Sequence, residues 1–274
     1  MNKKILIVFN PQKPNIKSFL KEFLNEIKNS FKNKIKIDVI SSEKITRKVQ
    51  RCDFIITLGG DGTILKVGDF AIKNEIPVAG VNLGSLGYLA EFDTKGIKKV
   101  LNDLIKENLD IQKRIVLEVN YKNKIYYAIN DCIVKPLSSK VCNVELFIDN
   151  QKITEFIGDG IIIATPTGST AYSLACGGSI VEPTTEVLLI TPISPHTLSI
   201  RPIIISSKFH IKLKIPQYKS NKNLLLSLDG QKNFSLNVYD VVYIKTAEKK
   251  LLFVPNKKQT FYKILTHKLS WGKR

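Results

Sequence analysis

The residues with the clearest chemical capacity form a glycine-rich run around one carboxylate, Gly59-Gly60-Asp61-Gly62-Thr63. Glycines let the backbone turn sharply and bring N–H groups against phosphates. A carboxylate within such a turn would oppose the binding of an anion, so we infer that Asp61 has a chemical task. We predict a general base that accepts the proton of an attacking hydroxyl, an effect of roughly 10² to 10⁴ in rate. An ordinary Gly-Asp-Gly turn is the alternative.

A second glycine-rich stretch, Gly80 to Leu89, also follows a predicted strand. Its glycines could line the same crevice, because open α/β sheets bind ligands beyond the carboxyl ends of their strands. A tight connection without a ligand is the alternative. Neither a P-loop pattern nor Gly-x-Gly-x-x-Gly occurs in the sequence, which disfavours the common ATPase and dehydrogenase phosphate cradles.

A hydroxyl-rich run, Thr-Pro-Thr-Gly-Ser-Thr-Ala-Tyr-Ser, extends from Thr165 to Ser173. We predict that it opens a short helix over 169–176, whose N-terminus Ser169 and Thr170 can cap. The hydroxyls and N–H groups there could face a polar ligand, and Tyr172 offers a ring on which a base can stack. A plain helix N-cap is the alternative.

The two glycine-rich runs follow strands of a predicted α/β domain. Mostly apolar runs at 4–9 and 54–58 are typical of buried parallel strands that end in loops. Further strands are predicted at 35–39 and 76–81, and helices at 19–31, 64–73 and 95–108. We therefore predict a doubly wound, nucleotide-binding α/β domain over residues 1–112.

The remainder of the chain reads mainly as β-structure. Short β-rich runs broken by turns occur at 115–120, 125–134, 143–149, 152–157 and 159–164, and the pattern continues to 254. We predict an all-β, sandwich-like domain over 113–254. Apolar residues at helical spacing between 260 and 271 predict a C-terminal helix, within segment 255–274, that packs back on the first domain.

The composition is that of an ordered two-domain protein, with 274 residues, 43% hydrophobic and 24% charged. No apolar run approaches the ~18 residues of a membrane span and the N-terminal apolar run is too short for a signal peptide, so we expect a cytoplasmic protein that does not enter membranes. The four cysteines lack metal-ligand spacing, which favours buried reduced thiols and no protein metal site.

The formal net charge of +18 is compatible with nucleic-acid binding. However, the lysines are scattered, as at Lys17, Lys21 and Lys28, and no basic block is interleaved with aromatic residues. We therefore expect no specific nucleic-acid recognition, although the charge favours anionic nucleotides. The histidines form no triad with a nucleophile, and we interpret His196 as a positioning or structural residue.

Six segments together resemble the NAD kinase family in order and spacing, and its bacterial members in particular. They are Gly59–Thr63, Gly80–Leu89, Asn130-Asp131, Asp159–Gly178, Pro195–Pro202 and Asp229-Gly230-Gln231. The Gly-Gly-Asp-Gly turn is only moderately specific, since diacylglycerol-type lipid kinases and phosphofructokinases resemble it. The run from Thr165 to Ser173 is close to diagnostic, and the resemblance covers nearly the whole chain.

The resemblance implies transfer of a phosphoryl group from ATP, or another triphosphate, to the 2'-hydroxyl of the adenosine ribose of NAD, giving NADP. It implies that NAD binds between the two domains and that Asp61 is the catalytic base. The resemblance also implies the NAD contacts. In the first domain they are Asp61, Gly62 and Lys66, near the reacting ribose. In the second domain, Asn130 and Asp131 contact the nucleotide, Asp159 contacts the nicotinamide part, and Gln231 is a weaker candidate. The residues at the adenosine half are Thr170, Ala171, Tyr172, Ser173, Leu174 and Ala175.

Two positions depart from the family pattern. The family usually has Asn-Glu where this chain has Asn130-Asp131, so the carboxylate is one methylene shorter. An arginine is common where this chain has Ile157, two residues before Asp159. The contact made by that arginine must come from elsewhere, and Lys140 is our candidate.

Two other functions compete with NAD phosphorylation, a lipid or sugar kinase that shares the Gly-Gly-Asp-Gly loop and a non-catalytic NAD(P)-binding sensor. The hydroxyl-rich run favours NAD over a lipid, and the intact Asp61 favours a catalyst over a sensor. We expect Mg²⁺ or a similar divalent cation, carried mainly by the triphosphate.

We also expect a homodimer or homotetramer, because pairing would cover the sheet edges of the β-rich half. The resemblance adds that the 193–196 loop of one subunit approaches the nicotinamide end of NAD held near Asp159 of another.

Overall fold

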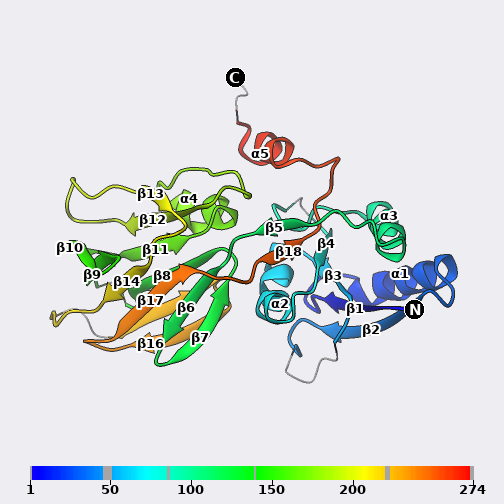
Figure 1. The fold of residues 1–274 in the computed structure, drawn as a ribbon, viewed down its shortest axis with the longest axis horizontal. Helices are drawn as coiled ribbons and strands as arrows, with labels where there is room; N and C mark the ends of the chain where they lie inside the picture. The colour runs from blue at the N-terminus through cyan, green and yellow to red at the C-terminus, as the bar shows by residue number, and fades with distance from the viewer. Residues whose placement is uncertain (1, 46–50, 85–86, 139, 220–222, 272–274) are drawn as a thin grey trace. The chain divides into compact units, whose positions relative to one another are not determined.

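The computed structural model describes residues 2–45, 51–84, 87–138, 140–219 and 223–271. They form two compact units (Figure 1), the first made of Met1–Lys113 with Leu251–Arg274 and the second of Arg114–Lys250. The structure thus divides the chain close to the predicted boundary at 112/113. The second unit ends at Lys250, four residues before the end predicted for the β-rich domain at 254.

The first unit is built on a six-stranded sheet in which every described pairing is parallel. Its strands, in spatial order, are β2 (Ile35–Ser41), β1 (Lys3–Phe9), β3 (Phe54–Gly59), β4 (Val78–Asn82), β18 (Leu251–Phe253) and β5 (Gln112–Arg114). Strand β3 is buried at all six positions, which explains its continuous apolar run.

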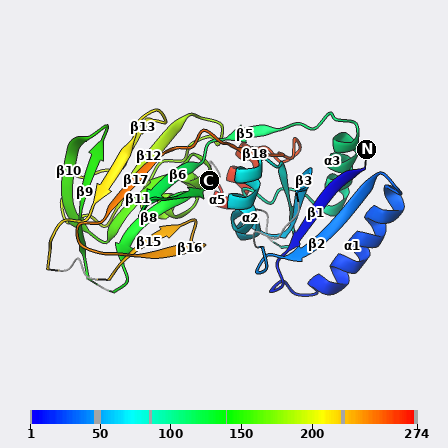
Figure 2. The ribbon, with the colours of Figure 1, turned by 60° about the horizontal axis from the view of Figure 1, so that its bottom comes forward.

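Helices cover both faces of this sheet, as the doubly wound prediction requires. They are α1 (Ile16–Ser30), α2 (Asp61–Asn74) and α3 (Thr94–Ile105), with α5 (Phe261–Leu269) following the last strand. Phe23 of α1 and Leu101 of α3 share one core cluster with Ile5 and Ile56 of the sheet. Helix α2 lies on the opposite side (Figures 1 and 2), where it contacts β3, β4 and β18. The α/β prediction is confirmed.

The second unit contains two antiparallel six-stranded sheets. The first has the order β10 (Gln151–Gly158), β9 (Cys142–Ile148), β14 (Ile211–Lys214), β17 (Val241–Thr246), β6 (Leu117–Tyr121) and β7 (Lys124–Ala128). The second has the order β13 (Ile203–Ser206), β12 (Val187–Ile193), β11 (Gly160–Ala164), β8 (Asp131–Pro136), β15 (Leu224–Leu228) and β16 (Lys232–Leu236).

One apolar core joins these two sheets, as a sandwich requires. Val119 and Leu213 of the first sheet and Val134 and Ile163 of the second belong to the same buried cluster. The sandwich prediction is therefore confirmed. All four cysteines are free, and burial raises the pKa of the Cys142 thiol to about 12, which keeps it protonated at neutral pH.

The segment after β11 covers the outer face of the second sheet. It contains a short 3₁₀ turn, η1 (Thr167–Thr170), and a single-turn helix, α4 (Tyr172–Ala175). Cys176 and Val181 pack against Ile162 and Leu189 of the sheet. The predicted continuous helix over 169–176 is wrong, because the backbone of Ala171 (φ −97°, ψ −134°) leaves the helical region between the two turns.

Two other sequence predictions change in the structure. The single β-run predicted at 125–134 is two strands, β7 and β8, separated by Ile129 and Asn130. Leu251–Phe253, predicted to end the β-rich domain, instead forms β18 beside β4, where Phe253 pairs with Val78. A β-like pattern identifies a strand without indicating the sheet to which it belongs.

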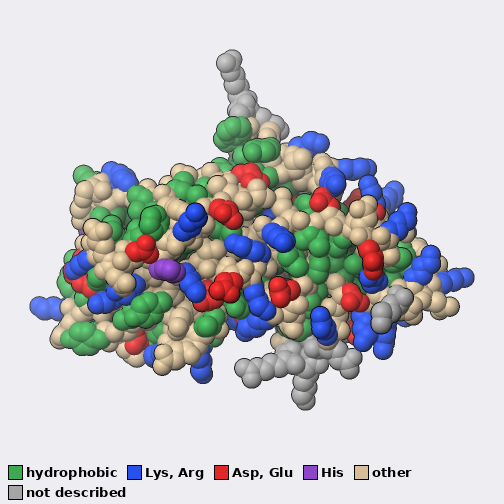
Figure 3. Space-filling model, viewed as in Figure 1, with side chains coloured by type: hydrophobic (Ala, Val, Ile, Leu, Met, Phe, Trp, Pro, Cys, Tyr) green, Lys and Arg blue, Asp and Glu red, His purple; other side chains and the backbone are tan. Residues whose placement is uncertain are grey.

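The molecular surface bears out the scattered charge expected from the sequence. On the face shown in Figure 3, Lys and Arg side chains are interspersed with Asp and Glu side chains. Among the described residues, no helix combines the length and apolarity needed to cross a membrane.

Candidate active site

Asp61 is the first residue of α2, three residues earlier than the predicted start at 64. Strand β3 ends at Gly59, and Gly60 adopts an extended conformation as the N-cap. A Cβ at Gly59 would lie 2.2 Å from the Thr63 hydroxyl, so the tight turn excludes a side chain there. The turn therefore places Asp61 directly at the junction between strand and helix.

The Asp61 carboxylate accepts hydrogen bonds from three successive backbone N–H groups. Oδ2 accepts from Tyr88 at 2.9 Å, and Oδ1 accepts from Leu89 at 3.0 Å and from Ala90 at 2.9 Å. A carboxylate has about four acceptor positions. Within the described part of the chain, Oδ2 therefore keeps capacity for one further proton donor, which a general base needs.

Gly87 allows this contact between the loop and Asp61. A Cβ built at Gly87 would lie 1.9 Å from Asp61 Oδ1, so a side chain would displace the carboxylate. The predicted association of the 80–89 stretch with the Asp61 turn is thus realised at its carboxyl-terminal end. Ser85 and Leu86 of that stretch lie outside the described residues.

The other predicted residues of the first unit lie on α2. Gly62 is exposed and Lys66 is half-buried, and their spacing of four residues puts them on one face of the helix. Asp61, Gly62 and Lys66 therefore form one group in the first unit, and the remaining predicted residues belong to the second unit.

Asn130 and Asp131 are held by a second carboxylate, that of Asp229. Asp229 accepts hydrogen bonds from the backbone N–H groups of Ile129 at 2.8 Å, Asn130 at 2.7 Å and Asp131 at 3.1 Å. Asp229 occupies the β15–β16 turn with a positive φ of 53°, a conformation that Asp tolerates. The motif Asp229-Gly230-Gln231 does not by itself indicate this role, and the Asp-Gly turn is the only local signal for Asp229.

The turn at Asn130 also contacts the start of the hydroxyl-rich run. Thr165 donates its hydroxyl hydrogen to the Ile129 carbonyl at 2.6 Å and accepts from the Gly168 N–H at 3.1 Å. A Cβ at Gly168 would lie 2.1 Å from the Asn130 carbonyl oxygen. The structure thus brings two predicted segments, 130–131 and 165–170, into direct contact.

Asp131, which is buried, and Asp229, which is half-buried, form a carboxylate pair. Burial, together with the charge of Asp229, raises the pKa of Asp131 from its usual 3.8 to about 7. Burial also raises the pKa of Asp229, to about 6, but the three N–H donors oppose that rise. The pKa of Asp229 is therefore lower than that of Asp131, because hydrogen bonds to a carboxylate favour its charged form.

The hydroxyls of the 165–173 run mostly face inward. Ser169 accepts from the N–H of Val181 at 3.0 Å and donates to its carbonyl at 3.1 Å. Ser173 is buried and its hydroxyl lies 2.8 Å from that of Thr191. The predicted capping role of Ser169 and Thr170 is wrong, since neither η1 nor α4 has a side-chain cap. These hydroxyls instead attach the loop to the sandwich.

The exposed part of the run consists of other predicted residues. Tyr172 is 38% exposed, Ala175 is exposed, and Thr170, Ala171 and Leu174 are half-buried. Tyr172 therefore retains a ring surface on which a base could stack. For Ser173, by contrast, the structure supports a positioning role.

Asp159 and Tyr172 lie near Lys135, a lysine that no sequence motif singled out. Asp159 is exposed between β10 and β11. Burial raises the pKa of Tyr172, with smaller contributions from Cys176 and then from the charge of Asp159. The Lys135 ammonium lies 6.0 Å from the centre of the Tyr172 ring. A Cβ at Gly160, next to Asp159, would lie 3.0 Å from that of Lys135. Lys135 is thus a cation near these residues, whereas the candidate Lys140 is exposed outside any strand.

The 193–196 loop lies beside Asp159 within the same chain. The Asp159 N–H donates to the Ile193 carbonyl, and the His196 N–H donates to the Ile157 carbonyl, both at 2.9 Å. The side chain of His196 is exposed. Gln231 is exposed in the β15–β16 turn, where its amide donates to the Asp229 carbonyl at 3.4 Å.

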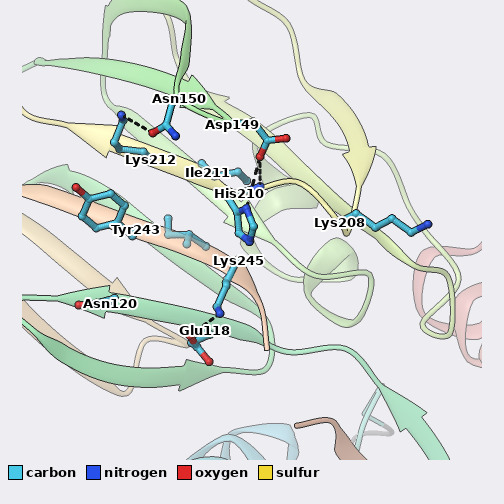
Figure 4. Close-up of a pocket in the computed structure, with 11 residues that line it drawn as sticks. Glu118, Asn120, Asp149, Asn150, Lys208, His210, Ile211, Lys212, Tyr243 and Lys245 are labelled. Atoms are coloured by element: carbon cyan, nitrogen blue, oxygen red, sulfur yellow. Dashed lines mark hydrogen bonds and ion pairs between the residues drawn. The ribbon is translucent and has the colours of Figure 1, made fainter. Parts of the chain in front are cut away.

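Two cavities open on the second unit. One, of about 370 Å³, is lined by Ala175, Cys176, Pro192, Ser194, Pro195, Ile200, Arg201 and Pro202, and so includes one predicted residue. The other, of about 510 Å³, contains none of them (Figure 4). Four of its side chains form two ion pairs, Lys245 with Glu118 at 3.3 Å and His210 with Asp149 at 3.6 Å, and Lys212 donates to Asn150 at 3.0 Å. Among the described residues, no three His, Cys, Asp or Glu side chains are grouped to hold a metal.

The raised pKa of Asp131 predicts how stability depends on pH. Because the folded state holds this proton more tightly than the unfolded state, the free energy of unfolding falls as pH rises from about 4, the unfolded pKa, to the folded pKa of about 7. An amide at this position cannot ionise, so we expect the free energy of unfolding of Asp131→Asn, relative to the parent, to increase by about 1 to 3 kcal/mol from pH 4.5 to pH 8. Urea denaturation at both pH values measures this. The exposed Glu248→Gln should show no such gain, and an equal response of both variants would contradict the assignment.

Comparison with known proteins matches the two parts of the chain separately. The family model described as the ATP-NAD kinase N-terminal domain matches residues 5–109, and that of the ATP-NAD kinase C-terminal domain matches residues 130–256. These matches cover most of the chain, including Asp61 and the other predicted residues.

Individual relatives give the same result. An NAD kinase of Thermoanaerobacter sp. (strain X514) is 39% identical over 234 residues, which are 83% of this chain and 82% of that protein. The yeast NADH kinase, solved in complex with NADH, superposes with a TM-score of 0.84 at 29% identity, covering 100% of this chain and 89% of that one. An NAD kinase from Archaeoglobus fulgidus, solved with ATP, shares the fold with a TM-score of 0.76 at 22% identity, covering 95% and 98% of the chains. This chain belongs to the NAD kinase family.

Proposed function

We propose that this protein transfers the terminal phosphoryl group of ATP, or of another nucleoside triphosphate, to the 2'-hydroxyl of the adenosine ribose of NAD, producing NADP. Family membership supports a kinase with NAD as its acceptor. The observation that carries the proposal is the Asp61 carboxylate, held by three N–H groups at the strand-to-helix turn with acceptor capacity left on Oδ2.

In this mechanism, Asp61 accepts the proton of the 2'-hydroxyl as its oxygen bonds to the terminal phosphorus. The bond from that phosphorus to the bridging oxygen breaks, and the nucleoside diphosphate leaves. Such transfers depend on positioning and electrostatics more than on covalent chemistry. A carboxylate already fixed by three hydrogen bonds does not have to be ordered when the substrate binds.

The second unit would bind the rest of NAD. Tyr172 supplies an exposed ring for adenine, and Asn130 presents a half-buried amide in the 130–131 turn. We assign to Lys135 the cationic contact that the family arginine, replaced here by Ile157, would make. Its ammonium near the Tyr172 ring supports this assignment.

Mg²⁺ enters the proposal as part of the triphosphate substrate. Mg²⁺ keeps several waters and binds through phosphates more readily than in a protein cage. Because the Asp61 carboxylate already accepts three hydrogen bonds, we assign it no metal. We also propose that the protein is cytoplasmic.

The direct test is to incubate the purified protein with NAD, ATP and Mg²⁺ and to measure NADP. NADH should be compared as acceptor, because the yeast relative was solved with NADH. EDTA should abolish the reaction and added Mg²⁺ should restore it. A diacylglycerol or sugar phosphorylated in place of NAD would favour the competing kinase functions, and binding of NAD without turnover would favour the sensor.

We expect Asp61→Asn to lower kcat by at least ~10²-fold, because the amide cannot accept the hydroxyl proton. An amide also has only one acceptor oxygen, so part of the loss will come from the released 88–90 loop. Steady-state kinetics with NAD and ATP measure the effect. Asp103→Asn, the same change on α3, should keep full activity, and full activity in Asp61→Asn would refute the general base.

Tyr172→Ala should weaken NAD binding more than it slows the bound complex. Stacking on adenine is made in both the ground and the transition state, so its loss raises KM while kcat changes little. Tyr172→Phe retains the ring and should behave like the parent. A collapsed kcat with an unchanged KM would remove Tyr172 from the binding residues.

We further propose a homodimer or homotetramer. Strand β13 is an edge strand of its sheet and exposes Ile203 and Ile204, and Leu198 in the preceding loop is 84% exposed. Unpaired apolar edges are commonly covered by association. In this proposal, the 193–196 loop of one subunit completes the NAD site near Asp159 of another.

Specific activity should then fall on dilution below the dissociation constant of the oligomer, and excess NAD should restore it through linkage. Light scattering at each concentration reports the oligomeric state. Constant specific activity while monomers form would refute the shared site and leave the kinase proposal intact.

A further inference from the structure

The loop that binds Asp61 is closed at its base. It leaves β4 at Asn82 and returns at Phe92, where the Asn82 N–H donates to the Phe92 carbonyl and the Phe92 N–H donates to that of Gly80, both at 2.9 Å. The three N–H groups that hold Asp61 lie near the returning end, at 88–90. Their position depends on whatever packs against this end of the loop.

The chain segment after β18 binds the residue that follows these N–H groups. Glu91 is only 6% exposed, and its carboxylate accepts from the Asn256 N–H at 2.7 Å. The Asn256 side-chain amide donates to the Glu91 carbonyl at 2.9 Å. Asn256 thus holds both the side chain and the backbone of Glu91, more than 160 residues away in the sequence.

Helix α5 packs against Tyr88, the first of the three residues whose N–H groups hold Asp61. The Tyr88 ring contacts that of Phe261 with centroids 6.2 Å apart, and the Lys268 ammonium lies 4.9 Å from the Tyr88 ring centre. Ile264 and Leu265, one turn along α5, are buried. Asp61 therefore holds the backbone of residues 88–90, and the C-terminal segment holds Tyr88 and Glu91.

We propose that the C-terminal segment 256–268 positions the catalytic carboxylate, with Asn256 and Phe261 as positioning residues for turnover. The inference rests on the proposed function, since it concerns the base of that reaction. Neither residue contacts Asp61. Each fixes the loop whose N–H groups orient the carboxylate, and small displacements of a reacting group lower rates strongly.

The first test compares kcat with KM for NAD. Asn256→Ala and Phe261→Ala should each lower kcat by about 10-fold, with a smaller change in KM, because the carboxylate is misaligned while most NAD contacts remain. Phe261→Tyr keeps the ring and should restore parental kcat. Tyr262→Ala, the neighbouring and exposed aromatic of α5, is the matched control and should change neither constant.

A double-mutant cycle separates positioning from general loss of structure. In the Asp61→Asn background, Asn256→Ala and Phe261→Ala should lower kcat by less than about 2-fold, since residues that act as a unit are not additive. A full 10-fold loss in that background, or unchanged kcat in the single variants, would overturn the proposal.

Hydrogen exchange provides a readout that does not depend on activity. The amides of Tyr88, Leu89 and Ala90 should exchange at least about 10-fold faster in both alanine variants than in the parent or in Tyr262→Ala. Unchanged exchange at these amides would overturn the proposal even if the parent makes no NADP. Absence of NADP with accelerated exchange would instead reject the proposed function and leave the positioning contact standing. If Asn256→Ala does not fold, the Phe261→Ala and Phe261→Tyr pair decides the question.

Discussion

The interaction of one carboxylate with three successive backbone N–H groups constrains the first unit. Asp61 can accept from Tyr88, Leu89 and Ala90 only because Gly87 has no side chain at the point of closest approach. The tight turn at Gly59 and Gly60 brings the start of α2 to that loop. The Asp61 carboxylate is thus held in one orientation after the end of β3, at the edge where α/β sheets bind ligands.

The second unit contains the same kind of contact between a carboxylate and the backbone. Asp229 also accepts from three successive N–H groups, those of residues 129–131, and it lies close to the buried carboxyl of Asp131. Burial raises the pKa values of Asp131 and Asp229, and the charge of Asp229 adds to the rise at Asp131. The hydrogen bonds of Asp229 fix the turn at 129–131, whereas those of Asp61 leave capacity on Oδ2 for one further proton donor.

Much of the architecture could be read from local pattern. The apolar run at 54–58 and the alternating runs after residue 113 predicted the parallel sheet and the sandwich, because strand and helix periods are properties of neighbouring residues. The contacts of the hydroxyl-rich run could not be predicted from local pattern. Ser169 was predicted to cap a helix and Ser173 to contact NAD, yet the structure pairs them with Val181 and Thr191. These partners come from later parts of the chain that a local pattern cannot identify.

The sequence by itself determined the two fold classes and the family, and it singled out Asp61 as the candidate base, since these depend on residue type, spacing and order along the chain. Only the tertiary structure decided that β18 joins the first sheet, that Lys135 lies near Tyr172, and that Asn256 holds the loop around Asp61. Each of these contacts joins residues far apart in the sequence. Such contacts depend on how whole elements pack, and no local period or turn signal encodes that packing.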